Sequence, residues 1–177
     1  GLRYAFAHGA THVLLLNDDA IVAPATLPAL VVAAETHPEA GLLGPKLLSQ
    51  EEPGRLLAAG GHFDARWTPV HRGGGEMDSG QYDHIEAVPF LSGCALLVSR
   101  TFVETVGPLD PRFFVYYEDA DWSYRAGKHG YAPTYVPSAR VWHPETSERD
   151  ADSQLVTYYM TRNRLLFLNK HRLGWMP

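Results

Sequence analysis

The chain has 177 residues, which at about 150 residues per domain predicts one domain with enough chain to bury a core. Its 15 Lys and Arg against 20 Asp and Glu give a formal charge of -5, which argues against nucleic-acid binding, because that function favours a basic face. With 45% hydrophobic and 20% charged residues, the composition excludes disordered, collagen-like and long coiled-coil proteins. The single cysteine, Cys94, cannot form an internal disulfide or a Cys-x-x-Cys zinc site, so we expect a reducing compartment.

Neither a membrane span nor a leader peptide is expected. The longest apolar runs, such as Leu27–Ala34, fall well short of the roughly 20 residues needed to cross a bilayer. Residue 1 is Gly, and the chain opens directly into a helix-like segment, Gly1–His8. We therefore expect this chain to be a piece of a longer protein.

The first elements form an α/β unit. After the helix, the apolar run Val13–Leu16 is typical of a strand buried on both faces. It stops at Asn17-Asp18-Asp19, and apolar residues at helical spacing over 24–36 predict a helix with Pro24 in its first turn. Ligands of such sheets gather beyond the carboxyl ends of strands, where the Asn-Asp-Asp loop would lie.

The rest of the chain continues the mixed pattern. Its Gly-rich stretch, 41–84, predicts strands joined by loops, and 88–99 predicts a strand pair around Ser92-Gly93. The further expected elements are helices over 101–106, 120–128 and 153–170 and strands over 131–136 and 140–143.

Two acidic segments carry candidate chemistry. Adjacent carboxylates in Asn17-Asp18-Asp19 suit a hard divalent metal shared with a substrate phosphate, although a turn that caps the next helix explains them equally well. In Glu118-Asp119-Ala120-Asp121, three carboxylates follow an aromatic run, so that desolvation could tune one of them as a general base. The alternative there is an acidic helix cap, with Asp121 paired to Arg125.

Two further segments leave a structural and a functional interpretation open. His143 follows a strand and becomes a metal-ligand candidate only if the fold brings it beside Asp19. From residue 155 onward the chain has four cationic residues, among them Arg162 and Arg164, and no acid. Phosphate or anionic lipid would suit this segment, whereas a core helix with cations near its C-terminal end is the structural alternative.

Taken together, these segments resemble the family 2 glycosyltransferases, in particular the branch of bacterial rhamnosyltransferase-like enzymes. The resemblance implies an α/β fold of the GT-A type, a Rossmann-like mixed sheet flanked by helices, over most of residues 1–170. Each matching stretch is weak alone, but they come in the family's order: Leu14–Ala20, Phe90–Ala95, Val106–Phe114, Tyr117–Trp122 with Arg125, Trp142–His143 and Arg162–Arg164.

The resemblance also implies roles for individual residues. Asp19 takes the second position of the family's DxD motif, which binds a divalent cation, Mg²⁺ or Mn²⁺, on the donor diphosphate. Asn17 takes the first position, in place of Asp, and His143 falls where related enzymes have a further metal ligand. Asp119 matches the base that deprotonates the acceptor hydroxyl. The remaining candidates are Ser92, Gly93, Cys94, Glu118, Asp121 and Trp122 around the sugars, and Arg162 and Arg164 as diphosphate or acceptor contacts.

By this resemblance, we expect residues 1–177 to be a single partial GT-A domain that lacks the N-terminal nucleotide-binding strands. Its function would be that of an inverting glycosyltransferase in the synthesis of cell-surface polysaccharide or glycolipid. The donor would be a nucleoside diphosphate sugar and the acceptor a saccharide or lipid-linked saccharide. The expected location is the cytoplasm, including peripheral contact with the inner face of the membrane. A non-catalytic carbohydrate-binding or interaction domain on a GT-A remnant, and a metal-dependent phosphoesterase, are the alternatives.

Overall fold

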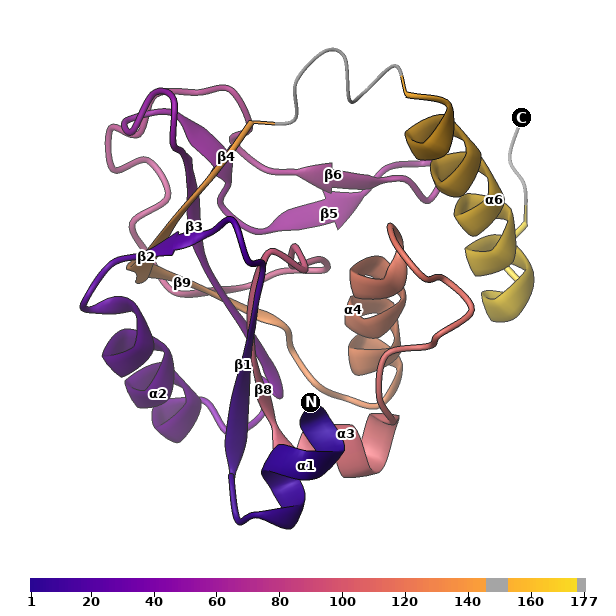
Figure 1. Ribbon diagram of the computed structural model, residues 1–177, viewed down its shortest axis with the longest axis horizontal. Coiled ribbons are helices and arrows are strands. Elements are labelled where there is room, and N and C mark those ends of the chain that lie inside the picture. The colour runs from indigo at the N-terminus through magenta and orange to yellow at the C-terminus, as the bar shows by residue number, and fades with distance from the viewer. Residues whose placement is uncertain (146–152, 175–177) are drawn as a thin grey trace.

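A mixed seven-stranded sheet forms the centre of the chain. A computed structural model describes residues 1–145 and 153–174 (Figure 1). Its main strand order is β1-β8-β3-β9-β2, with β4 paired to β3 and β7 paired to β9. The strands are β1 (His12–Leu16), β2 (Ile21–Val22), β3 (Leu42–Ser49), β4 (Leu56–Ala58), β7 (Glu86–Ala87), β8 (Ala95–Ser99) and β9 (Thr134–His143). A separate hairpin pairs β5 (Gly61–Phe63) with β6 (Pro69–His71).

The strand directions bring distant segments to one edge of the sheet. β8 runs antiparallel to both β1 and β3, and β3 runs parallel to β9. β1, β3 and β9 therefore end at the same edge, where β8 begins. The residues that follow Leu16, those that precede Ala95 and those around His143 must meet there, although they lie far apart in the sequence.

Helices cover both faces of the sheet because side chains alternate along each strand. On one face, α2 (Thr26–Thr36) buries Leu30 and Ala33 against Leu43, Leu97 and Val136. The other face, formed by the alternate positions Leu42, Leu96, Val98 and Tyr135, packs against α3 (Arg100–Val106) and α4 (Glu118–Lys128). Figure 1 shows α2 on the side of the sheet opposite α4.

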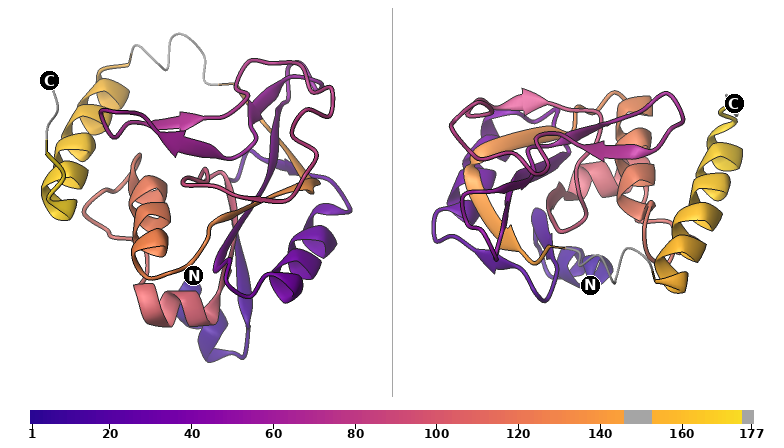
Figure 2. Two further views of the ribbon diagram at one scale, coloured as in Figure 1. Left: turned by 180° about the vertical axis from the view of Figure 1, so that it is seen from behind. Right: turned by 90° about the horizontal axis from the view of Figure 1, so that it is seen from above.

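The short helix α1 (Leu2–Ala7) precedes β1, and α6 (Gln154–His171) lies at the outer side of the molecule, beyond α4 (Figure 2). Ion pairs hold the C-terminal end of α6. Lys170 Nζ lies 2.7 Å from carboxylate oxygens of both Asp110 and Asp121, and His171 Nε2 lies 2.8 Å from Asp121 Oδ1. Arg125 adds a contact of 2.8 Å to the fully buried Asp121. The expected Asp121–Arg125 pair is thus one part of a larger network.

One charged residue lies inside the sheet. Lys46, in the middle of β3, is fully buried, and its Nζ donates to Asp78 at 2.8 Å and to Asp83 at 2.5 Å. These two carboxylates come from the long segment between β6 and β7. Since a buried ammonium is costly unless it is paired, the pair ties that segment to the sheet.

Most of the expected elements are present, but three expectations were wrong. No hairpin forms around Ser92-Gly93, because Phe90 makes only an isolated bridge to Gly61 while β8 pairs with β1 and β3. The two strands expected over 131–136 and 140–143 are one strand, β9, which stays paired with β3 across a register shift. β1 is partly exposed rather than buried on both faces, since among the described strands only β8 pairs with it.

Within residues 1–145 and 153–174, no helix has both the length and the apolar character that a membrane span requires.

Candidate functional site

A cavity of about 420 Å³ opens at the edge of the sheet where β1, β3 and β9 end. Segments from the whole length of the chain contribute to its wall. The lining residues are Asn17, Leu47, Leu57, Ala58, His71, Ser92, Gly93, Cys94, Val115, Tyr116, Glu118, Asp119, His143 and Pro144. The structure thus brings six of the sequence candidates and the Asn-Asp-Asp loop to one place, as expected for a ligand site beyond the carboxyl ends of strands.

Asn17, Asp19 and His143 form a group at one side of this cavity. The Asn17 amide donates to His143 Nε2 at 3.1 Å, and Asp19 Oδ1 lies 3.1 Å from the same nitrogen. His143 Nδ1 lies 2.8 Å from the carbonyl oxygen of Pro144. Because a carbonyl oxygen only accepts, Nδ1 carries a proton, and Nε2 of the neutral ring faces Asp19 with its lone pair. A carboxylate and this lone pair repel each other unless a proton or a cation lies between them.

This group fits a divalent cation that is shared with a substrate. Among residues 1–145 and 153–174, no three His, Cys, Asp or Glu side chains cluster closely enough to hold a metal ion by themselves. Asp19 and His143 would supply two ligands, and Asn17 would supply a third if its amide turned its oxygen toward them. Mg²⁺ is commonly held by one or two carboxylates together with substrate phosphates, so the donor set is suited to a metal–phosphate complex.

Asp119 also lines the cavity, from the first turn of α4. Its Oδ2 accepts the backbone N–H of Gly93 at 2.8 Å, and its Oδ1 accepts that of Ala120 at 2.7 Å. Burial raises the pKa of Asp119, while these two donors and the nearby His71 act to lower it. A Cβ atom added to Gly93 would lie 3.3 Å from Asp119 Oδ2, so glycine allows the loop to approach this carboxylate. The result is a fixed carboxylate with raised basicity.

Glu118 is the second carboxylate of the cavity. Burial and, to a lesser degree, the charge of Asp119 raise the pKa of Glu118 to about 7. Its Oε2 is buried and has no hydrogen-bond partner among the described residues. Two neighbouring carboxylates repel each other, and desolvation strengthens this repulsion. A state in which the pair carries one proton is therefore favoured.

His71 belongs to the site although nothing in its local sequence marks it. It ends β6, and the isolated bridge between Gly61 and Phe90 places the β5–β6 hairpin over the cavity. The His71 ring packs 5.3 Å from the Phe90 ring, and desolvation lowers the pKa of His71, against the opposite effect of Asp119. An imidazole near this carboxyl group can donate or accept a proton. His71 is one of nine histidines and lies outside every motif described above, so the sequence alone did not identify it.

Comparison with known proteins identifies the family of this chain. The model of the family described as "Glycosyltransferase like family 2" matches residues 1–163. The chain belongs to this family. The resemblance stated from the sequence motifs is therefore confirmed.

Two curated relatives of this family 2 glycosyltransferase are mycobacterial. The N-acetylglucosaminyl-diphospho-decaprenol L-rhamnosyltransferase of Mycobacterium tuberculosis is 33% identical over 92% of this chain. The galactofuranosyltransferase GlfT2 of Mycolicibacterium smegmatis is 25% identical over 90% of it. The chain spans 56% of the length of the first relative and 27% of the second.

A solved structure supports the fold of the family 2 chain. The crystal structure of GalNAc-T7 with UDP, GalNAc and Mn²⁺ superimposes with a TM-score of 0.66 over 94% of this chain and 33% of that one. At 17% identity, this likeness concerns the fold alone. The expected GT-A fold, a mixed sheet flanked by helices, is confirmed.

Five candidates of the family resemblance are not among the lining residues. Asp19 contacts the lining residue His143, and the other four lie away from the cavity. Asp121 is buried in the network with Lys170, and Trp122 is a core residue whose Nε1 donates to the carbonyl oxygen of Gly107 at 2.9 Å. The two arginines of α6 bind backbone carbonyl oxygens: Arg162 that of Arg112 at 2.9 Å, and Arg164 that of Arg66 at 3.0 Å. In this structure, all four therefore hold neighbouring segments in place.

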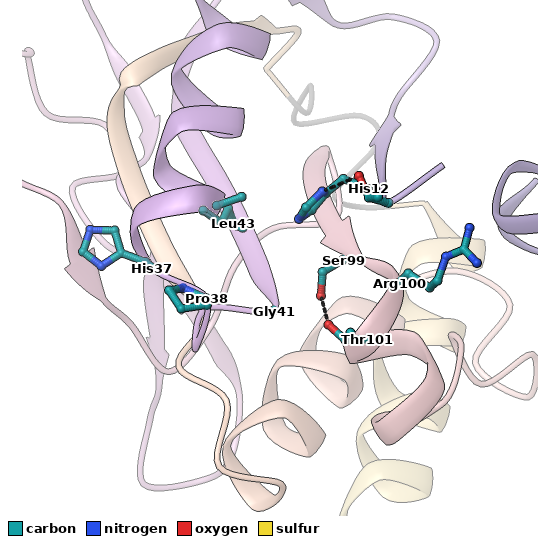
Figure 3. A pocket seen from close by; sticks show the side chains of 10 residues that line it. His12, His37, Pro38, Gly41, Leu43, Ser99, Arg100 and Thr101 are labelled. Carbon is teal, nitrogen blue, oxygen red and sulfur yellow. Dashed lines mark hydrogen bonds between the residues drawn. The ribbon is translucent and has the colours of Figure 1, made fainter. Parts of the chain in front are cut away.

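A second cavity, of about 290 Å³, lies at the opposite end of the sheet, where β1 begins and β8 ends. Figure 3 shows its lining side chains, with Arg100 directed away from it. Arg100 donates to the carbonyl oxygens of Phe6 and Ala10, and the Ser99 and Thr101 hydroxyls lie 3.1 Å apart. No carboxylate is among the described residues that line it, so the first cavity is the site where the family's chemistry is expected.

Proposed function

We propose that this chain is the catalytic region of an inverting glycosyltransferase that moves a sugar from a nucleoside diphosphate donor to an acceptor hydroxyl. The observation that carries the proposal is that Asp119 lines the same cavity as Asn17 and His143, and that Asp19 contacts His143. A carboxylate base and a cation-binding group in one cavity are what a displacement at an anomeric carbon requires.

In the proposed reaction, Asp119 accepts the proton of the acceptor hydroxyl as its oxygen forms a bond to the anomeric carbon. The bond from that carbon to the diphosphate oxygen breaks on the opposite face, so one displacement inverts the centre. The raised basicity of Asp119 suits the step, because a general base works best with a pKa near the operating pH. The Gly93 N–H holds the carboxylate in place, with Glu118 and His71 beside it.

Asn17, Asp19 and His143 are the residues that would hold the divalent cation, Mg²⁺ or Mn²⁺. When bound, such a cation neutralises negative charge on the diphosphate leaving group. The imidazole contributes through Nε2, since Nδ1 donates to Pro144. The Asp19 carboxylate, on the exposed loop after β1, is open to a ligand that arrives from solvent.

The names of the relatives are the basis for the proposed substrates and location. One relative is named for a rhamnosyl transfer involving a diphospho-decaprenol lipid, and the other for galactofuranosyl transfer. We therefore propose a saccharide or lipid-linked saccharide acceptor, a role in cell-surface polysaccharide or glycolipid synthesis, and a cytoplasmic site at the inner face of the membrane. Residues 1–177 would form a single partial GT-A domain without the N-terminal strands that bind the nucleotide.

The test is a transfer assay of Asp119→Asn in the full-length protein that carries this chain. The substitution keeps the size of the side chain and removes the base, so the rate should fall on the order of a hundred- to ten-thousand-fold while donor binding survives. Asp19→Asn should weaken metal-dependent donor binding, and Asp18→Asn, an exposed neighbour in the same loop, is its matched control. A near-parental rate of Asp119→Asn would refute the base role. Saccharide binding by the parent without any transfer would favour the non-catalytic module instead.

A further inference from the structure

The loop that leads into α4 has an unusual backbone. Three residues that are not glycine adopt the left-handed conformation: Phe114 with φ of 65°, Tyr116 with 64° and Tyr117 with 71°. Tyr117 directly precedes α4, and its side chain makes no capping hydrogen bond. Because L-residues rarely adopt this conformation, the surrounding structure must hold the loop. The helix that it introduces begins with Glu118 and Asp119.

A single buried side chain from α6 holds this loop. The Nδ2 group of Asn163, which is fully buried, lies within hydrogen-bond distance of three carbonyl oxygens: those of Phe113 at 2.8 Å, Val115 at 2.7 Å and Tyr116 at 2.7 Å. Its Oδ1 accepts a hydrogen bond of 2.6 Å from Arg162. The three carbonyl groups belong to the same short stretch as the left-handed residues, so the Asn163 contact fixes the part of the loop whose backbone is strained.

We infer that Asn163 is a positioning residue that sets the place of Asp119 in the cavity through the loop before α4. This inference rests on the proposed function and names a residue that acts on its base without touching substrate. The distance from loop to carboxylate is short: Tyr117 is the N-terminal boundary of α4, and Asp119 follows two residues later.

The contact between Asp119 and Gly93 leaves little tolerance. The carboxylate accepts the Gly93 N–H at 2.8 Å, and the space around the Gly93 Cα is small enough that an added Cβ would lie 3.3 Å from either Cβ or Oδ2 of Asp119. A small rotation of the first turn of α4 would therefore break this hydrogen bond. The position of the Asp119 carboxylate therefore depends on the contacts that fix the loop before α4.

The Gly93 amide gives a direct readout of this dependence. In a nitrogen-15 NMR experiment on the chain, Asn163→Ala should move the Gly93 amide proton upfield, and that amide should exchange with solvent about tenfold faster, as expected on loss of a hydrogen bond. Asn169→Ala removes an exposed asparagine of the same helix and should leave both values unchanged. A folded Asn163→Ala chain whose Gly93 amide behaves as in the parent would overturn the inference.

A second variant covers the case in which Asn163→Ala does not fold. Phe114 is 76% exposed, and glycine adopts its φ of 65° without strain, so Phe114→Gly should make the loop geometry less dependent on Asn163. The double variant Phe114→Gly/Asn163→Ala should therefore fold, and its Gly93 amide should exchange faster than that of Phe114→Gly alone. A folded double variant whose Gly93 amide behaves as in Phe114→Gly would overturn the inference.

Kinetics in the full-length protein then separate positioning from stability. Asn163→Ala should lower kcat by about a hundredfold with little change in the KM for the donor, because a base displaced by about 1 Å costs that much. A loss confined to melting temperature, with kcat per folded molecule unchanged, would assign Asn163 a purely structural role and refute the inference. If the parent transfers no sugar, the proposed function fails while the NMR result still decides the positioning.

Discussion

Replacing Glu118 by glutamine should change how the stability of the fold depends on pH. The Glu118 carboxyl is partly buried, its Oε2 has no partner among the described residues, and its pKa lies at about 7 in place of the ordinary 4.5. The folded chain therefore keeps a proton on this group up to a higher pH than the unfolded chain does. A raised carboxyl pKa makes the folded state less stable as the pH rises through the interval from 4.5 to about 7.

The size of the effect follows from the same shift. Each pKa unit corresponds to about 1.4 kcal/mol, so the full shift of Glu118 would lower the free energy of unfolding by roughly 3 kcal/mol above neutral pH. Water reaches the open side of the cavity and reduces this to about 2 kcal/mol. Glutamine has a similar shape and cannot ionise. Glu118→Gln should therefore be more stable than the parent by about 2 kcal/mol at about pH 8, and nearly equal to it at about pH 4.5.

Urea unfolding of both chains at several pH values between about 4.5 and 9 measures this difference directly. Subtracting the two curves removes the contributions of the other titrating groups, except for the neighbouring Asp119, with which Glu118 titrates as a pair. Glu35→Gln, at an exposed position of α2, is the matched control and should give a difference that does not vary with pH. Parallel curves for the parent and Glu118→Gln would show that the carboxyl is solvated and would refute the reasoning.

Three further outcomes are expected. Lys46→Ala should lower the free energy of unfolding by about 3 to 5 kcal/mol in urea titrations, because it removes the fully buried cation that pairs with the partly buried Asp78; a loss below about 1 kcal/mol would mean that water reaches the pair. Burial opposes the charge of Asp121, but His171, Lys170 and Arg125 outweigh it and hold its pKa below the ordinary value. Asp121→Asn should therefore destabilise the chain by about 3 kcal/mol above about pH 4 and progressively less below it, and a constant difference would contradict this network. Burial raises the pKa of the Cys94 thiol to about 12, so iodoacetamide at about pH 8 should alkylate it only after unfolding, and rapid labelling of the native chain would disprove its burial.

Short-range signals in the sequence predicted the elements and part of the site. The apolar run before Asn17 became β1, and the first-turn acids of α4 lie near the N-terminal end of that helix, as their charge predicted. The apolar spacing over 24–36 became α2, which buries Leu30 and Ala34 but leaves Leu27 and Val31 exposed. These features depend on neighbours within a few residues, for which periodicity and the helix dipole are sufficient. The acidic segments were found in the same way, whereas the family resemblance assigned roles to Asn17 and Asp119.

Long-range pairing decided the rest. The segment 131–143 contains one strand rather than two because β3 stays paired with β9 on both sides of the register shift. No hairpin forms at Gly93 because β8 pairs with β1 and β3 instead. His143 reaches Asp19 only because β1 and β9 end at one edge of the sheet, 124 residues apart in the chain. No motif contains His71, and although Asn163 lies in the matching stretch Arg162–Arg164, its contact with the loop before α4 has no local signature. A hydrogen bond between residues so far apart in the sequence requires the chain to close a long loop, which costs conformational entropy. Burial of the whole hydrophobic core offsets this cost, so the neighbours of each residue in the sequence do not reveal the contact.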